Sequence, residues 1–97
     1  ESTLIYAQRE LKEETGFSAQ NWKLFLTMHL SPSITQEQGF TYLATDLQEG
    51  ERALEETEDI VVKRLPFEQV FQQVMKGEIT NAMTVASIMK VRLLGLA

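Results

Sequence analysis

The stretch that decides the fold is RELKEETGF, residues 9–17. It closes a run from Leu4 to Glu14 that contains neither Gly nor Pro and is rich in strong helix formers. Apolar residues recur along this run at helical spacing, and Gly16 follows it as a typical helix stop. The sequence therefore predicts a short amphipathic helix that ends at this glycine.

The predicted helix carries three glutamates on one face, because Glu10, Glu13 and Glu14 are spaced three and four residues apart. Carboxylates this close repel one another at neutral pH, and Arg9 offsets only part of that repulsion. The face therefore needs either a cation or full solvation, and hard oxygen donors of this kind suit Mg²⁺ or Mn²⁺. Charge runs are usually solvated surface, so the helix taken alone favours the plain surface interpretation.

The remaining pattern indicates three strands and two further helices. The predicted strands are Trp22 to Leu30, Phe40 to Leu47 and the β-branched segment Ile60 to Leu65. The predicted helices begin at Pro66 and near Asn81. This order indicates an α/β fold, but three strands are few for a sheet packed between helices. We therefore expect an N-terminal portion of the fold to be missing.

Length and composition predict a single globular domain over residues 1–97, with 43% hydrophobic residues. The net charge of −5 argues against a basic surface that binds nucleic acid. The absence of cysteine excludes a disulfide scaffold and a Cys-based zinc site, and it fits a reducing cytoplasm. No apolar run approaches the length that spans a membrane.

A wider pattern surrounds the acidic helix. It reads Glu-x7-Arg-Glu-aliphatic-x-Glu-Glu-x-Gly-hydrophobic, and its fixed residues are Glu1, Arg9, Glu10, Glu13, Glu14 and Gly16. This pattern resembles the Nudix box without its opening Gly-x5 segment. The resemblance implies a Nudix-type α/β/α sandwich, here lacking its N-terminal strands, and a magnesium-dependent pyrophosphohydrolase.

The later part of the chain is similar to the ADP-ribose pyrophosphatase branch of this family. Ser31-Pro32 lies where that branch places its characteristic proline, and ETEDI at residues 56–60 resembles its acidic loop. The resemblance implies hydrolysis of ADP-ribose to AMP and ribose 5-phosphate, with Mg²⁺ as cofactor and Mn²⁺ as an alternative ion. It also implies a homodimer that takes a small nucleotide substrate and binds neither nucleic acid nor membrane.

Site roles follow from the resemblance, residue by residue. The expected metal ligands are Glu10, Glu13, Glu14 and Glu58, and the expected general base is Glu56. Arg9 would orient the carboxylates, and Glu1 would pair with Arg9. Pro32 and Glu37 would lie near the terminal ribose. Two alternatives stay open, namely another nucleotide sugar or dinucleoside polyphosphate as substrate, and a non-catalytic ligand-sensing domain.

Overall fold

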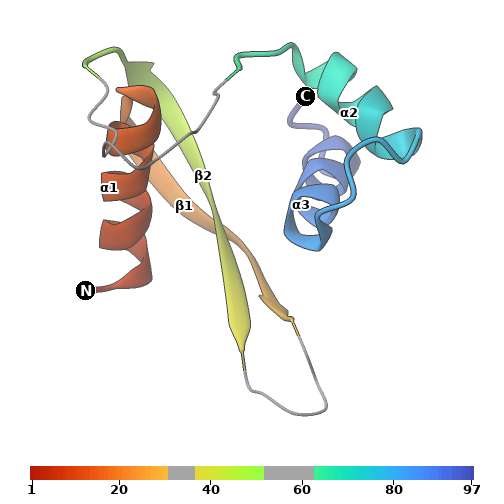
Figure 1. The fold of residues 1–97 in the computed structure, drawn as a ribbon, viewed down its shortest axis with the longest axis horizontal. Coiled ribbons are helices and arrows are strands. Elements are labelled where there is room, and N and C mark those ends of the chain that lie inside the picture. Colours follow the sequence, from red (N-terminus) through yellow and green to blue (C-terminus); the bar gives the residue numbers. More distant parts are fainter. Residues whose placement is uncertain (31–36, 52–62) are drawn as a thin grey trace. The chain divides into compact units, whose positions relative to one another are not determined.

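A computed structural model describes residues 1–30, 37–51 and 63–97 (Figure 1). It combines helices and strands, which confirms the predicted α/β class. The elements in chain order are α1 (Thr3–Thr15), β1 (Ser18–His29), β2 (Gln38–Gln48), α2 (Phe67–Met75) and α3 (Ala82–Leu93).

The chain divides into two compact units. The first unit combines Glu1–Phe25 with Tyr42–Lys63, and the second combines Leu26–Thr41 with Arg64–Ala97. The acidic helix α1 belongs to the first unit, and the helices α2 and α3 belong to the second.

Helix α1 forms as predicted, with both ends capped by local chemistry. The Ser2 hydroxyl accepts a hydrogen bond from the Ile5 backbone N–H at 3.1 Å, which satisfies one of the free donors of the first turn. Gly16 takes the left-handed conformation at φ 80° and donates its backbone N–H to the Lys12 carbonyl at 2.9 Å. The stretch that carries the three glutamates is thus helical to its end.

Strands β1 and β2 form a two-stranded antiparallel sheet (Figure 1). The first strand begins at Ser18, earlier than the alternation from Trp22 predicts. Its buried residue is Phe25, at 7% exposure, whereas Leu24 is 50% exposed. The buried side chain is therefore not one of the alternating apolar set that runs from Trp22. Alternation shows which side chains share a face, and tertiary packing decides which face is covered.

The predicted third strand lies partly outside the described residues. Residues 63–66 belong to no helix or strand, so the described part of Ile60 to Leu65 is not a strand. Pro66, predicted as the first residue of a helix, is instead its N-cap at φ −58° and ψ 141°, and α2 begins at Phe67. The extended ψ places this residue just before the helix.

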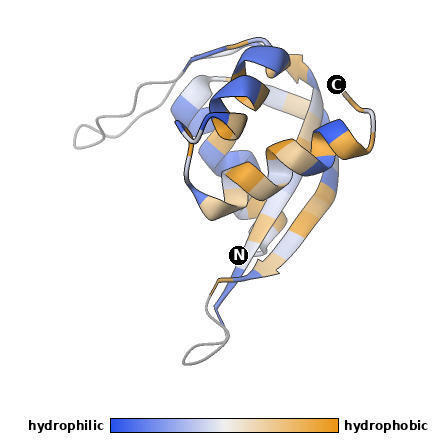
Figure 2. Ribbon diagram, turned by 90° about the vertical axis from the view of Figure 1, so that its right-hand side faces the viewer, coloured by the Kyte–Doolittle hydropathy of each residue, from blue (hydrophilic) through white to orange (hydrophobic). Residues whose placement is uncertain are grey.

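The second unit is built on the packing of α2 against α3. Val74 of α2 is buried at 6% exposure, and Figure 2 shows α3 hydrophobic along most of its length. At its N-terminus, the Asn81 side chain accepts a hydrogen bond from the Thr84 backbone N–H at 3.0 Å. The Ser87 hydroxyl of α3 donates to the Thr41 hydroxyl at 3.1 Å, which ties this helix to β2.

None of the described helices is long and apolar enough to cross a lipid bilayer.

Candidate active site

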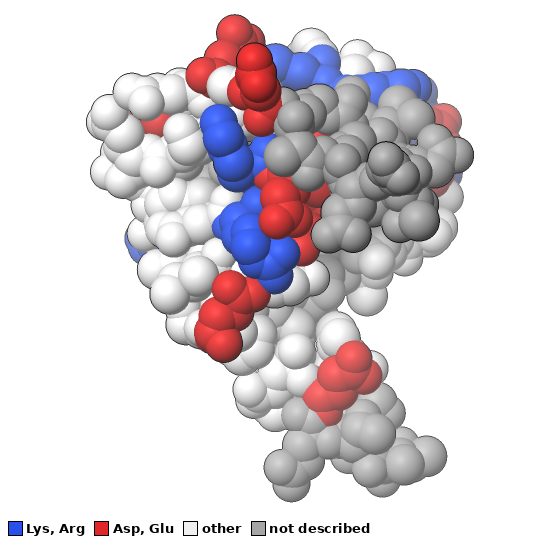
Figure 3. Space-filling model, turned by 60° about the vertical axis from the view of Figure 1, so that its left-hand side comes forward, with Lys and Arg blue, Asp and Glu red and all other residues white. Residues whose placement is uncertain are grey.

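The predicted metal ligands of α1 lie on a half-buried face of that helix. The side chains of Glu10 and Glu13 are 26% and 28% exposed, compared with 44% for Arg9. Glu14 is also intermediate between buried and exposed. Figure 3 shows acidic and basic side chains interleaved on the face of the molecule that carries α1. The glutamates are therefore partly withdrawn from water, unlike a fully solvated helix face.

Arg9 is the centre of an ion-pair network within this face. One guanidinium nitrogen, Nη2, lies 2.7 Å from Glu1 Oε1. The other, Nη1, lies 3.4 Å from Glu10 Oε1 and 3.3 Å from Glu13 Oε1. The hydrogen bonds that Arg9 donates to Glu1, and next those to Glu13, hold the pKa of its guanidinium above the ordinary value. The pairing of Glu1 with Arg9 that the resemblance implies is present.

Tyr6 adds an aromatic contact that the sequence analysis did not identify. The Arg9 guanidinium carbon lies 5.1 Å from the centroid of the Tyr6 ring, one helical turn earlier. The spacing of three residues on a predicted helix is the signal that could have revealed it. Three carboxylates and one ring thus hold this single cation in place.

The donor chemistry of α1 suits a divalent metal, but its carboxylates pair with Arg9 in the structure. Over residues 1–30, 37–51 and 63–97, no three acidic or histidine side chains are grouped closely enough to hold an ion. Glu10 and Glu13 direct oxygens at the guanidinium instead. Carboxylate oxygens at helical offsets of three and four residues are the donors that Mg²⁺ takes in proteins, so the residues present fit the ion chemically.

The C-terminal turn of α1, residues 12–16, is approached closely by Gly50, which follows β2. The Lys12 ammonium donates a hydrogen bond to the Gly16 carbonyl at 3.2 Å. Gly50 lies two residues beyond β2 and approaches both groups. A Cβ atom built on it would lie 2.9 Å from the Gly16 carbonyl oxygen and would overlap the Lys12 ammonium. Nothing in the sequence pattern pointed to this long-range contact.

Near its other end, α1 is tied to the hairpin by polar and aromatic contacts. The hydroxyls of Thr3 and Tyr42 are 2.5 Å apart. The Tyr42 ring meets Trp22 edge-on, with ring centroids 6.4 Å apart and planes at 67°. The Trp22 indole N–H donates to the Ala19 carbonyl at 3.0 Å. These bonds fix the position of the acidic helix on the sheet of the first unit.

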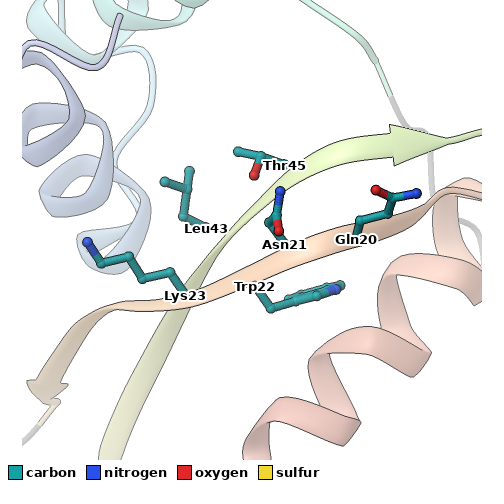
Figure 4. Close-up of a pocket in the computed structure, with 6 residues that line it drawn as sticks. All are labelled: Gln20, Asn21, Trp22, Lys23, Leu43 and Thr45. Atoms are coloured by element: carbon teal, nitrogen blue, oxygen red, sulfur yellow. The ribbon is translucent and has the colours of Figure 1, made fainter.

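A shallow pocket of about 410 Å³ lies on the hairpin in the first unit. Figure 4 shows its lining, which consists of Gln20, Asn21, Trp22, Lys23, Leu43 and Thr45. None of these six residues was predicted as a site residue. The pocket is therefore separate in composition from the carboxylates of α1.

Of the other predicted site residues, the structure describes Glu37. Glu37 is exposed and belongs to the second unit, where its carbonyl accepts a hydrogen bond from the Leu30 backbone N–H at 3.0 Å. Pro32, Glu56 and Glu58 lie outside the described residues. The structure thus brings together Glu1, Arg9, Glu10 and Glu13, and it leaves the predicted base and ribose contacts as predictions.

No family model matches the chain. Comparison with known proteins nevertheless finds three relatives that are each named as a pyrophosphatase. An ADP-ribose pyrophosphatase of Mycobacterium tuberculosis is 33% identical over 89 residues, which are 90% of this chain and 43% of the relative. An ADP-ribose pyrophosphatase of Bacillus subtilis is 32% identical over 89 residues, or 48% of its length. A GDP-mannose pyrophosphatase of an Enterobacter species is 30% identical over 95 residues, or 50% of its length.

The chain spans about half the length of the curated relatives that it matches. The matched region includes nearly the whole of this sequence, from 90% to 95% in these comparisons. Together with the acidic motif on α1, these matches confirm the resemblance that the sequence predicted. The chain is thus similar to pyrophosphatases of ADP-ribose and of GDP-mannose, in line with the resemblance to the Nudix family.

Proposed function

We propose that this protein hydrolyses the diphosphate linkage of a nucleoside diphosphate sugar. ADP-ribose is the favoured substrate, and water splits it into AMP and ribose 5-phosphate. The observation that carries the proposal is the half-buried set of glutamates around Arg9 on α1, in a chain related to two ADP-ribose pyrophosphatases. The partial burial of Glu10 and Glu13 is what distinguishes this face from a fully solvated charge run.

In the proposed reaction, Glu10, Glu13 and Glu14 would hold magnesium together with Glu58. When bound, magnesium would supply positive charge against the phosphates and a water ligand of lowered pKa. Glu56 accepts a proton from the attacking water, a contribution of about 10²–10⁴-fold for a well-placed base.

Arg9 orients the carboxylates in this proposal, and Glu1 anchors Arg9 through the 2.7 Å contact. Such outer partners fix the direction in which a ligand side chain points. Pro32 and Glu37 contact the terminal ribose. Homodimeric assembly and a cytoplasmic location remain predictions from the resemblance and the composition.

A second candidate substrate is GDP-mannose. The relative named for that activity matches 95% of this chain, which is more than the 90% matched by the two ADP-ribose pyrophosphatases. The reaction would be the same, with GMP and a hexose 1-phosphate as products in place of AMP and ribose 5-phosphate. The same carboxylates would serve both substrates, so the choice between them depends on base and sugar contacts outside α1.

The test is substrate profiling of the full-length protein with Mg²⁺. ADP-ribose, GDP-mannose and a dinucleoside polyphosphate are compared by chromatographic detection of the nucleotide product. We expect the highest kcat/KM with ADP-ribose. Glu13→Gln keeps the shape of the side chain but removes its charge, so we expect turnover to disappear while the circular dichroism spectrum is unchanged. Unchanged turnover in that variant would falsify the metal-site proposal.

A wild-type protein that binds ADP-ribose in calorimetry but hydrolyses none of the three substrates would support the non-catalytic sensor instead. If GDP-mannose is the better substrate by kcat/KM, the reaction class stands and the assignment of ADP-ribose is wrong. Omitting Mg²⁺ and adding a chelator is the matched control, because both the favoured and the second substrate require the metal in this proposal.

A further inference from the structure

The C-terminal turn of α1 carries two of the three glutamates, Glu13 and Glu14, and it is held by a contact outside the predicted motif. Gly50 comes from the end of β2, far along the chain. Figure 1 shows the end of β2 beside the C-terminal end of α1. A residue that fixes this turn also fixes where its two carboxylates lie relative to the sheet.

The contact is too close for any other residue type. A Cβ atom at position 50 would lie 2.9 Å from the Gly16 carbonyl oxygen, a distance that real Cβ atoms essentially never show. It would also overlap the Lys12 ammonium. The backbone of Gly50 does not need a left-handed φ, so close approach is the reason for glycine here.

The two neighbours of Gly50 differ in how easily they can move. The Lys12 ammonium is the far end of a flexible side chain and could turn aside. The Gly16 carbonyl is backbone, and it is fixed because Gly16 is the left-handed cap of α1 at φ 80°. The Lys12 ammonium also donates a hydrogen bond to this carbonyl at 3.2 Å, and its positive charge offsets the partial negative charge at the C-terminal end of the helix. A methyl group at position 50 therefore has to displace backbone.

We propose that Gly50 is a positioning residue for the carboxylates of α1, acting through Lys12 and the Gly16 carbonyl. The backbone after β2 rests on the last turn of the helix and sets the position of Glu13 and Glu14 on the sheet. Lys12 completes the contact by holding the Gly16 carbonyl. This inference rests on the proposed metal site, and it adds a residue that the acidic motif does not contain.

The test is Gly50→Ala in the full-length protein. Changes in groups that orient metal ligands cost about 10- to 100-fold in metal affinity or activity. We expect the Mn²⁺ dissociation constant, measured without substrate by electron paramagnetic resonance of the free ion, to rise about tenfold. We expect kcat for the best substrate to fall by a similar factor while KM stays within about twofold, because substrate contacts outside α1 are unchanged.

The matched control is Gly39→Ala, which introduces similar crowding in the second unit. There a Cβ atom would lie 2.8 Å from Met83 Sδ and 3.3 Å from Leu30 Cδ2. Any loss of activity caused by general destabilisation should appear in both variants. We expect Gly39→Ala to lower the melting temperature but to leave Mn²⁺ affinity and kcat at the wild-type values. Equal loss of Mn²⁺ affinity in both variants overturns the positioning role.

Lys12→Ala keeps the inference testable if Gly50→Ala does not fold. This variant removes the bond to the Gly16 carbonyl without adding any crowding. Loss of a positive charge beside carboxylates would by itself tighten Mn²⁺ binding. The positioning role predicts the opposite sign, a weaker binding by about threefold or more. Tighter or unchanged binding overturns it.

The outcomes separate this inference from the proposed function. If the wild-type protein binds Mn²⁺ but hydrolyses no diphosphate substrate, and Gly50→Ala still weakens that binding, the positioning role stands and the proposed reaction is wrong. If the wild type is active and Gly50→Ala keeps its Mn²⁺ affinity and kcat, the reaction stands and the positioning role is wrong. A wild type that binds no Mn²⁺ overturns both.

Discussion

Two arginines in different units show how the same side chain is used in opposite ways. Arg9 of α1 pairs with Glu1, Glu10 and Glu13, so one positive charge is shared by three negative ones. Among the described residues, Arg92 of α3 forms an ion pair with Glu68, and its guanidinium lies 3.9 Å from the centroid of the Phe71 ring and 5.5 Å from that of Phe67. The first cluster keeps an excess of negative charge, whereas the second is balanced and mostly apolar.

The difference indicates different purposes. A cluster that leaves carboxylates under-neutralised costs folding free energy, and it is retained where another cation is to be bound. A balanced pair laid over aromatic rings gains packing and cation–π energy and offers nothing to a metal. Under the proposed function, the first cluster serves metal binding and the second serves packing. Removing each arginine in turn tests that distinction.

The largest expected effect is on turnover. Arg9→Ala removes the group that directs Glu10 and Glu13, and a displacement of about 1 Å in reacting groups can cost about 100-fold in rate. We expect kcat of the full-length enzyme to fall by about that factor. Arg92→Ala is the matched control and should keep kcat within about twofold. Equal losses of kcat in the two variants would mean that Arg9, like Arg92, supports the fold and has no separate role in turnover.

The second expected effect is on stability, and here Arg92→Ala should be the more affected variant. Arg92→Ala removes a guanidinium held over Phe71, and its side chain is 35% exposed. Cation–π contacts and buried aliphatic stems contribute about 1 kcal/mol together. We expect the free energy of unfolding in urea to fall by about 1 kcal/mol in Arg92→Ala, with a smaller change in Arg9→Ala. A larger loss in Arg9→Ala would remove the distinction between the regions.

The sequence predicted the first of these regions better than the second. Glycine and asparagine caps are local, so Gly16 and Asn81 marked helix ends that the structure contains. The pairing of Arg9 with Glu13 follows from a helical offset of four residues. The acidic face of α1 could thus be predicted from the sequence, because all of its members lie on one short helix.

Contacts between distant elements could not be predicted in this way. Arg92 donates a hydrogen bond to Glu68, although 24 residues separate them along the chain. Gly50 approaches the Lys12 ammonium, although the whole β1–β2 hairpin lies between them in the sequence. No periodicity links such positions, because their proximity depends on how the elements pack. The burial of Phe25 in place of Leu24 has the same origin. The sequence predicted contacts within a single helix. It could not predict contacts that depend on how distant elements pack.

The smallest expected effect concerns the pH dependence of stability in the second unit. A hydrogen bond from Gln72 at 3.1 Å, and next the pairing with Arg92, hold the pKa of the Glu68 carboxyl below its ordinary value. The unfolded chain therefore binds a proton at a higher pH than the folded protein. The stabilisation is present above the unfolded pKa and is lost as the pH falls through the folded one.

Glu68→Gln removes this titrating group. We expect the variant to be slightly less stable than the wild type at neutral pH, and the difference to shrink as the pH falls below the ordinary pKa of a glutamate and through the lowered pKa of Glu68. Urea unfolding at several pH values measures this. Because the Glu68 side chain is 63% exposed, the change should be smaller than that in Arg92→Ala. A stability difference that stays constant with pH would show that Glu68 acts by packing and not by its charge, and the second cluster would then owe nothing to electrostatics.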